Sequence, residues 1–233
     1  MMTFSFKGTD SATYGVYLTE HPTIIAAEKR VEFIEVPGRD GALSIYDGAF
    51  NDVETELMGY MQTTTYRDAI LGWLTGSGDL ILSTDTTRAY KARITGQVEI
   101  ERVSRGLGAW LLRIPVRLQP FRYHYPAVAN IVKTVSGQSV TNPGTYKSRP
   151  RIAIAGSGDI DLWIGTQLVE LAGVETGYVI DSEVMDCYAA DGVTLDNGKA
   201  TLDDYPTLAV GANVVSWTGT VTSVTITPRW RDM

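Results

Sequence analysis

The chain is poor in the residues from which most active sites and disulfide-stabilised folds are built. Its 233 residues include one cysteine, Cys187, and two histidines, His21 and His124. A single cysteine excludes an intrachain disulfide and provides no metal-ligand spacing. Two histidines leave little of the usual supply of general acids and bases. We interpret Cys187 as a small buried residue rather than as a nucleophile.

Long apolar runs are also missing. No stretch approaches the roughly twenty residues that a membrane-spanning helix requires. The start, Met1-Met2-Thr3-Phe4, has neither the basic nor the apolar region of a secretory signal. We therefore expect no membrane insertion, and we expect the chain to be made in a cytosol-like compartment.

Positive charge is scarce in the second half. The whole chain has 20 basic and 27 acidic residues, a net charge of −7. Residues 1–140 are nearly neutral (14 − 15 = −1), whereas residues 141–233 are acidic (6 − 12 = −6). Because binding to a phosphate backbone requires clustered Lys and Arg, we expect no sequence-specific binding of nucleic acid.

Motifs that carry known chemistries are absent as well. There is no nucleophile elbow, Walker loop or zinc signature. The Gly156-Ser157-Gly158 stretch lacks the third glycine and the following helix of a dinucleotide-binding loop, and the carboxylates of the second half lack calcium-loop spacing. A glycosidase would need two carboxylates across one cleft, which a sequence cannot place. We expect no catalytic residue, no cofactor, no metal site and no enzymatic activity.

What the sequence does contain is a series of short strand patterns and one helix. Alternation of apolar and polar residues predicts mainly β structure. In the helix, Tyr66, Ile70, Trp73 and Leu74 form one apolar stripe. Candidate N-caps lie at 63–65, and Gly76-Ser77-Gly78 is expected to end the helix. Pro115, inside an apolar run, predicts an edge strand or a bulge.

A change of composition divides the chain. The stretch 134–146 is rich in Thr, Ser, Gly, Asn and Pro, which is typical of a connection. We predict domains at 1–135 and 136–233. The second shows eight short strand patterns separated by turns, one of them at Gly156-Ser157-Gly158, and this spacing favours a jelly-roll-like sandwich. Its three tryptophans, Trp163, Trp217 and Trp230, are interpreted mainly as core residues.

One turn near residue 40 lies between two predicted strands of the first domain. The run 31–36 reads as a strand, and a second strand begins near Leu43 and turns at Asp47-Gly48. Between them lies Pro37-Gly38-Arg39-Asp40-Gly41, in which the proline and the glycines favour a tight turn. Two interpretations stand side by side: a charged surface turn, or a rigid loop that docks Arg39 on another surface.

The order of several motifs resembles one known family. The residues involved are Phe4-Ser5-Phe6-Lys7-Gly8-Thr9-Asp10-Ser11, Tyr14-Gly15-Val16, the Val36-Pro37-Gly38-Arg39-Asp40-Gly41 turn, Asn142-Pro143-Gly144, Arg149-Pro150-Arg151, Tyr205-Pro206-Thr207-Leu208 and Ile226-Thr227-Pro228-Arg229-Trp230-Arg231. Together they resemble the distal tail proteins of long-tailed (siphovirus) bacteriophages over almost the whole chain.

The resemblance implies an N-terminal β-sandwich with one helix and a C-terminal galectin-like β-sandwich. It implies a non-enzymatic virion protein of phage or prophage: a sixfold ring that forms a hub at the tail tip and leaves a channel for DNA. The implied partners are further copies of the chain, the tail tube protein and a tail-associated lysin-like tip protein, with a receptor-binding protein as a further candidate. The implied location is the virion tail tip, after assembly in the host bacterial cytoplasm.

An alternative function is a carbohydrate-binding module that contacts cell-surface saccharides. Exposed aromatic rings would then stack on sugars, and Trp163, Trp217 and Trp230 are the candidates. Exposure of these rings distinguishes the two interpretations, since rings that fill a sandwich core cannot reach a sugar.

Overall fold

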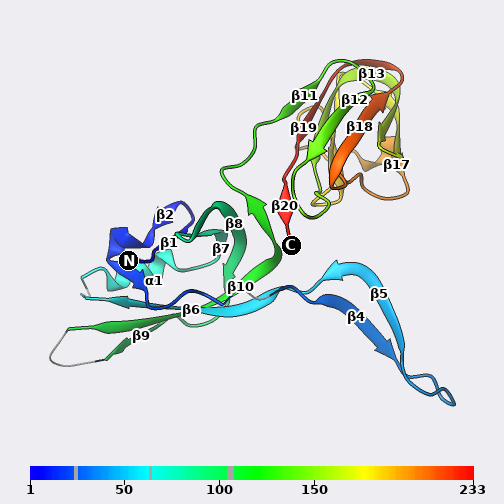
Figure 1. Ribbon diagram of the computed structural model, residues 1–233. Coiled ribbons are helices and arrows are strands. Elements are labelled where there is room, and N and C mark those ends of the chain that lie inside the picture. The colour runs from blue at the N-terminus through cyan, green and yellow to red at the C-terminus, as the bar shows by residue number, and fades with distance from the viewer. Residues whose placement is uncertain (24–25, 63–64, 104–107) are drawn as a thin grey trace. The chain divides into compact units, whose positions relative to one another are not determined.

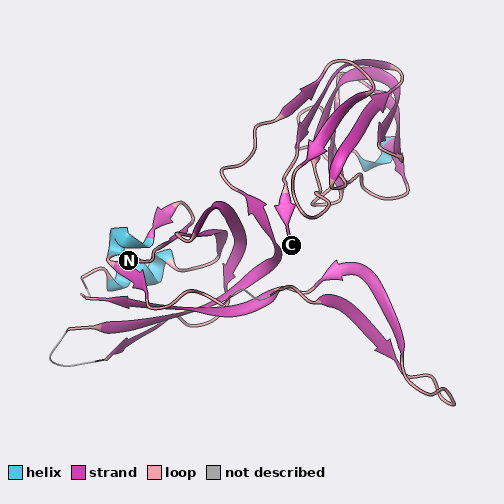
Figure 2. Cartoon of the chain, in the orientation of Figure 1, coloured by secondary structure: helices cyan, strands magenta, loops and turns pink. Residues whose placement is uncertain are grey.

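The computed structural model describes residues 1–23, 26–62, 65–103 and 108–233, and the chain is mainly β (Figure 1, Figure 2). It divides into two compact units, Met1–Tyr125 with Met233 and Pro126–Asp232. The second unit thus begins before the sequence-based boundary at 135/136 and includes strand β11 (Ile131–Lys133). Whether 1–135 and 136–233 fold independently stays a prediction.

The first unit is built on one sheet that curls round its own core. Its strands are β1 (Phe4–Phe6), β2 (Thr9–Asp10), β3 (Val16–Leu18), β6 (Val53–Met61), β7 (Ser77–Leu82), β8 (Asp85–Ile94), β9 (Glu99–Arg102) and β10 (Trp110–His124). They run in the order β2-β1-β7-β8-β10-β6-β3, and β9 pairs with β10. A bridge between Met2 and Leu18 joins β3 back to the start of β1. A sheet closed in this way buries one face without a second sheet.

Helix α1 (Arg67–Trp73) packs on that core, as the apolar stripe predicts. Ile70 and Leu74 are buried. Trp73 stacks on the Phe4 ring, with 5.5 Å between centroids, and its Nε1 donates to the Phe6 carbonyl at 2.9 Å. A short 3₁₀ helix, η1 (Ser11–Tyr14), adds Tyr14 to the same aromatic cluster.

The N-cap predicted for this helix is wrong where the structure describes it, whereas the helix does end before Gly76. Its N-cap is Tyr66, which makes no capping hydrogen bond through its side chain, so Thr65 is not the cap; 63–64 lie outside the described residues. The helix ends before Gly76, and Ser77 already begins β7. Core packing of Ile70 and Trp73, rather than capping, fixes this short helix.

The expectation that Pro115 marks an edge strand is also wrong. Strand β10 is interior, with β6 on one side and β8 and β9 on the other. The Pro115 carbonyl accepts from the Thr95 amide at 3.4 Å, on the side where β8 ends at Ile94 and β9 begins at Glu99. Both backbone groups of a strand residue point to the same side. The missing N–H of Pro115 therefore faces a gap in the neighbouring strands, where no ladder bond is lost.

The second unit is a two-layer sandwich in which both layers share one strand. Its elements are β11, β12 (Gln138–Asn142), β13 (Arg151–Ile164), β14 (Gln167–Val174), β15 (Tyr178–Asp181), β16 (Asp186–Ala189), η2 (Asn197–Lys199), β17 (Ala200–Leu202), β18 (Gly211–Trp217), β19 (Thr220–Thr227) and β20 (Arg231–Asp232). The first half of β13 pairs with β15 and β19, and its second half pairs with β14 and β18.

This long strand corrects the turn predicted at Gly156-Ser157-Gly158. The three residues lie inside β13, at the point where the strand leaves one layer and enters the other. Register shifts occur at Ala155/Gly156 and at Gly158/Ile160. A side chain on Gly156 would meet the Thr220 carbonyl at 2.4 Å. The glycines therefore allow a bulged crossing between layers rather than a chain reversal.

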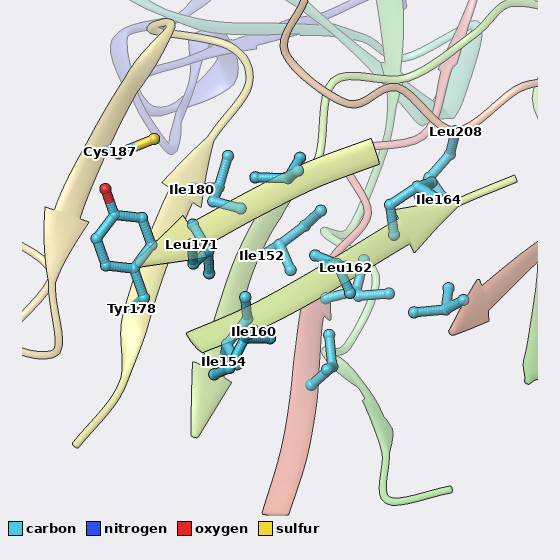
Figure 3. Close-up of a cluster of buried hydrophobic side chains, with 14 of the residues drawn as sticks. Ile152, Ile154, Ile160, Leu162, Ile164, Leu171, Tyr178, Ile180, Cys187 and Leu208 are labelled. Atoms are coloured by element: carbon cyan, nitrogen blue, oxygen red, sulfur yellow. The ribbon is translucent and has the colours of Figure 1, made fainter. Parts of the chain in front are cut away.

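The core of the second unit lies between these layers (Figure 3). Ile152, Ile160, Leu162 and Ile164 are fully buried and alternate with outward residues along β13. Cys187 is 1 % exposed, and Figure 3 shows the Tyr178 hydroxyl pointing toward it. Burial raises the pKa of the Cys187 thiol. It is thus a buried core residue, as interpreted from the sequence.

Candidate assembly arm

Among the residues that the structure describes, two strands of the first unit pair only with each other. Strand β4 (Lys29–Ile34) and strand β5 (Leu43–Phe50) form an antiparallel ribbon that no other strand joins (Figure 1). We call residues 29–50 the arm. An isolated two-stranded ribbon is marginally stable in water at best, so the way in which the arm is held is the central question about it.

Both faces of the arm are apolar. Directly opposite residues share a face, so the pairs Val31–Tyr46 and Phe33–Ser44 lie on one side and Ile34–Leu43 on the other. Phe33 is 71 % exposed, and the other large apolar residues of the arm that are exposed are Ile34, Val36, Leu43, Ile45 and Tyr46. Contiguous exposed apolar surface of this kind marks an interaction site.

The base of the arm is fixed to the sheet. Phe50, the last residue of β5, packs edge-on against Phe121 of β10, with 5.6 Å between ring centroids. Two residues farther on, the Asp52 carboxylate accepts from Arg117 Nε at 2.8 Å. A ribbon anchored at one end and uncovered along its length presents its side chains to a partner.

The turn predicted at Asp47-Gly48 is instead a bulge inside β5. Three residues, 47–49, oppose the single residue Arg30 of β4, and Gly48 has φ +83°. Arg30 Nε donates to Asp47 Oδ2 at 2.8 Å, and Asp47 Oδ1 accepts from the Ala49 amide at 2.9 Å. These hydrogen bonds, first of all those from Arg30, lower the pKa of Asp47. The bulge increases the local twist of the arm.

The predicted docking loop, Pro37-Gly38-Arg39-Asp40-Gly41, forms the tip of the arm. The Arg39 amide donates to the Val36 carbonyl at 3.1 Å, and Gly38 has φ +82°. Proline followed by a glycine of positive φ is the signature of a type II turn. All five residues of the loop are exposed, and the docking role of Arg39 stays a prediction.

The three candidate tryptophans lie in different surroundings. Trp230 is 4 % exposed and belongs to the core of the second unit, so it offers no face to a saccharide. Trp217 is half-buried and packs against the same core. Trp163 alternates with the buried Leu162 and Ile164 and therefore points outward, half-exposed. A saccharide contact at Trp163 stays a prediction.

Within the described part of the chain, no cluster of three His, Cys, Asp or Glu side chains could hold a metal ion. None of the helices described there is long and apolar enough to cross a membrane. The observations that point to a function are therefore the fold and the exposed apolar arm.

Sequence reasoning singled out the tip of the arm but missed its faces. The sequence did contain a signal for two apolar faces. In the run 31–36, apolar residues occupy odd positions (Val31, Phe33) as well as even positions (Ile34, Val36), and these point to opposite faces of a strand. A half-buried surface strand would place apolar residues on one parity only.

No model of a known protein family matches the chain, and neither does any curated protein sequence. Solved structures do match. The Dit protein of phage SPP1, described as a paradigm of the hub adsorption apparatus in phages that infect Gram-positive bacteria, aligns with a TM-score of 0.72 and 15% identity. The alignment covers 97% of this chain and 98% of that one.

This chain has the fold of a phage distal tail protein. A second match, to a structure of the phage p2 baseplate in its activated conformation with Sr, has a TM-score of 0.50 and 8% identity and covers 97% of each chain. Both matches extend over the two units, so the distal-tail fold includes the sandwich of the second unit as well as the curled sheet of the first.

Proposed function

We propose that the chain is a structural hub protein of a phage tail tip. In this proposal, copies assemble into a sixfold ring that joins the tail tube to a lysin-like tip protein and leaves a channel for DNA. The role is non-enzymatic. The protein resides in the virion tail tip after assembly in the host bacterial cytoplasm, and a receptor-binding protein is a further candidate partner. The fold shared with SPP1 Dit supports the proposal.

The observation that carries the assembly role is the arm. Its apolar residues are exposed on both faces, so water contacts surface that would be more stable when covered. Burying a large apolar side chain contributes about 1.5–3 kcal/mol, and several residues of the arm are available. A neighbouring copy that covered the arm would gain this free energy, which makes the arm the contact between copies.

The proposal is tested by removing the apolar surface without disturbing the fold. Phe33→Ser and Ile45→Ser each change one face of the arm, and Val132→Ser, which alters an exposed valine of the second unit, is the control. Sedimentation velocity over a range of concentrations measures association, and negative-stain microscopy shows whether the particles are sixfold rings.

We expect Phe33→Ser and Ile45→Ser to melt like the wild type and to need about ten times more protein to associate, since each loses roughly 1.4 kcal/mol or more per contact. Val132→Ser should associate normally. A wild-type chain that sediments as a monomer at every concentration, or arm variants that associate as the wild type does, would overturn the proposal.

A further inference from the structure

A charged cleft opens on the outer face of the sheet in the first unit. Its volume is about 650 Å³, and β7, β8, β10 and the segment after the arm contribute to its wall. Five charged residues line it: Asp52, Asp79, Lys91, Arg93 and Arg117. Arg93 and Arg117 are directly opposite each other on β8 and β10, an arrangement that is unfavourable for two like charges unless anions accompany them.

The anions present in the cleft satisfy only some of the cations. Asp79 accepts from Lys91 Nζ at 2.8 Å, and Asp52 accepts from Arg117 Nε at 2.8 Å. Arg93 donates its Nε to the Ser77 hydroxyl at 3.0 Å, and no carboxylate of the described residues lies within ion-pairing distance of it. Arg117 also lies 3.7 Å from the Glu54 carboxylate beside the cleft, so Arg93 is the one cation of the cleft that no described carboxylate accompanies. Its planar guanidinium fork fits a carboxylate.

The tip of the arm carries the complementary groups. Glu35, Arg39 and Asp40 are exposed, and none of them forms an ion pair with another described residue. A tip with two carboxylates beside one guanidinium can pair with Arg93 while Arg39 approaches the acidic side of the cleft at Asp79. Because the tip and the cleft each carry charges of both signs, their complementarity determines the orientation in which the tip binds as well as the strength of attraction.

A tip cannot reach the cleft of its own chain. The cleft includes Asp52, which follows the base of the arm by two residues. Strand β5 has 8 residues between tip and base, so at about 3.3 Å per residue the tip lies roughly 25 Å from that base. A ribbon paired along its length does not fold back over this distance, and the tip must find the cleft in another copy.

We propose that the tip of the arm docks in the Arg93–Arg117 cleft of a second copy of this chain, where Glu35 or Asp40 pairs with Arg93. The inference rests on the proposed function, because it names the surface that receives the arm. Tip and cleft are different patches, so the contact is head-to-tail, the type of contact that generates rings when the rotation closes.

A charge-reversal experiment on the full-length chain tests the inference. One variant carries Arg93→Glu, a second carries Glu35→Lys with Asp40→Lys, and a third combines all three changes. Arg67→Glu, an exposed arginine of the same unit outside the cleft, is the matched control. The concentration at half-association is measured by sedimentation velocity, and circular dichroism verifies the melting temperature of each variant.

We expect each single-sided reversal to raise the concentration at half-association at least tenfold, the combined variant to recover most of that loss, and Arg67→Glu to match the wild type. If Arg93→Glu associates normally while Phe33→Ser fails to associate, docking of the tip in the cleft is disproved. The arm then remains the contact between copies. Failure of the combined variant to recover would disprove this docking as well. Normal association of Phe33→Ser itself would overturn the proposed function.

Discussion

Arg229 and Asp181 form a two-pronged ion pair that ties the chain after β19 to the end of β15. Arg229 Nη1 lies 2.6 Å from Asp181 Oδ1, and Nη2 lies 2.8 Å from Oδ2. Arg229 also has φ +49°, a left-handed conformation that non-glycine residues adopt at a cost. The pair thus holds a strained residue in place and positions the neighbouring Trp230 in the core.

We predict that Asp181→Ala destabilises the second unit by about 2 kcal/mol, because it removes both charge-assisted hydrogen bonds to the half-buried Arg229, whose Nε stays 3.2 Å from the Glu183 carboxylate. Urea unfolding followed by tryptophan fluorescence measures the loss. Asp203→Ala, at an exposed carboxylate of the same unit, should change the free energy of unfolding by less than about 0.5 kcal/mol. Equal effects of the two substitutions would contradict the importance of the pair.

The same pair makes stability depend on acid pH. Burial raises the pKa of Asp181, but the hydrogen bonds from Arg229 outweigh it, and the net pKa is lowered. A carboxyl with a lowered folded-state pKa stabilises the fold above its unfolded pKa of about 3.9, and this contribution is lost as the pH falls through the folded pKa. We expect the wild type to exceed Asp181→Asn in stability at pH 7 and the difference to shrink below pH 4. A pH-independent difference in urea midpoint would disprove this linkage.

Arg39→Ala tests the docking loop without touching the fold. Because Arg39 is exposed, its removal should leave the melting temperature of the monomer nearly unchanged, within about 0.5 kcal/mol of stability. It should weaken ring formation, since a rigid type II turn loses little entropy on docking. Melting and sedimentation of the same variant distinguish a contact between copies from a contact within the monomer. A destabilised monomer would indicate that Arg39 makes an internal contact, and normal assembly would show that Arg39 has no role in docking.

The domain boundary can be tested with two fragments. The fragment 136–233 corresponds to the sequence-based boundary, and 126–233 adds β11, which pairs with β19 through Ile131 and its neighbours. We expect both to fold and the longer fragment to melt several degrees higher, because the shorter one loses the half-buried Ile131 and uncovers the edge of β19. Equal melting temperatures would show that β11 contributes nothing to the second unit.

Gly156→Ala tests the crossing of β13 between layers. An added Cβ would lie 2.4 Å from the Thr220 carbonyl, so β19 must move, and we expect a loss of at least 2 kcal/mol. Gly198→Ala is the matched control, since a Cβ there meets nothing within 4 Å. Thermal melting of the two variants decides whether the close approach in β13 is as tight as the structure describes.

The strands of the second unit were largely predictable from sequence. Apolar alternation and turn residues predict strands at 167–171, 178–181, 200–202, 213–217 and 221–226, which correspond to β14, β15, β17, β18 and β19. Three local predictions were wrong for one shared reason. Each concerns glycine, aspartate or proline, residue types that end strands when only the local sequence is considered. Here Gly156 to Gly158 lie inside β13 where it changes layer, Asp47-Gly48 form a bulge inside β5, and Pro115 lies inside β10 beside an interruption in the neighbouring strands. Which of these outcomes occurs depends on partner strands far away in the sequence.

The candidate site shows the same limit. The tip of the arm could be found because Pro37 and Gly38 define a turn by local chemistry alone. The cleft could not, because Arg93 and Arg117 become neighbours only through the register of β8 with β10. That no carboxylate among the described residues pairs with Arg93 depends on the whole sheet and leaves no mark in the sequence around it.

The shared strand β13 also sets an order of events during synthesis. Its first half has β19 as a neighbour, and β19 begins only at Thr220. The pairings within Met1–Tyr125 are all available once β10 has been made, whereas β13 leaves the ribosome long before either layer can be completed. If the first unit folds independently, as we predict, it folds while translation continues. The second unit then waits with an unpaired apolar strand, the state in which a chaperone would bind and aggregation would begin.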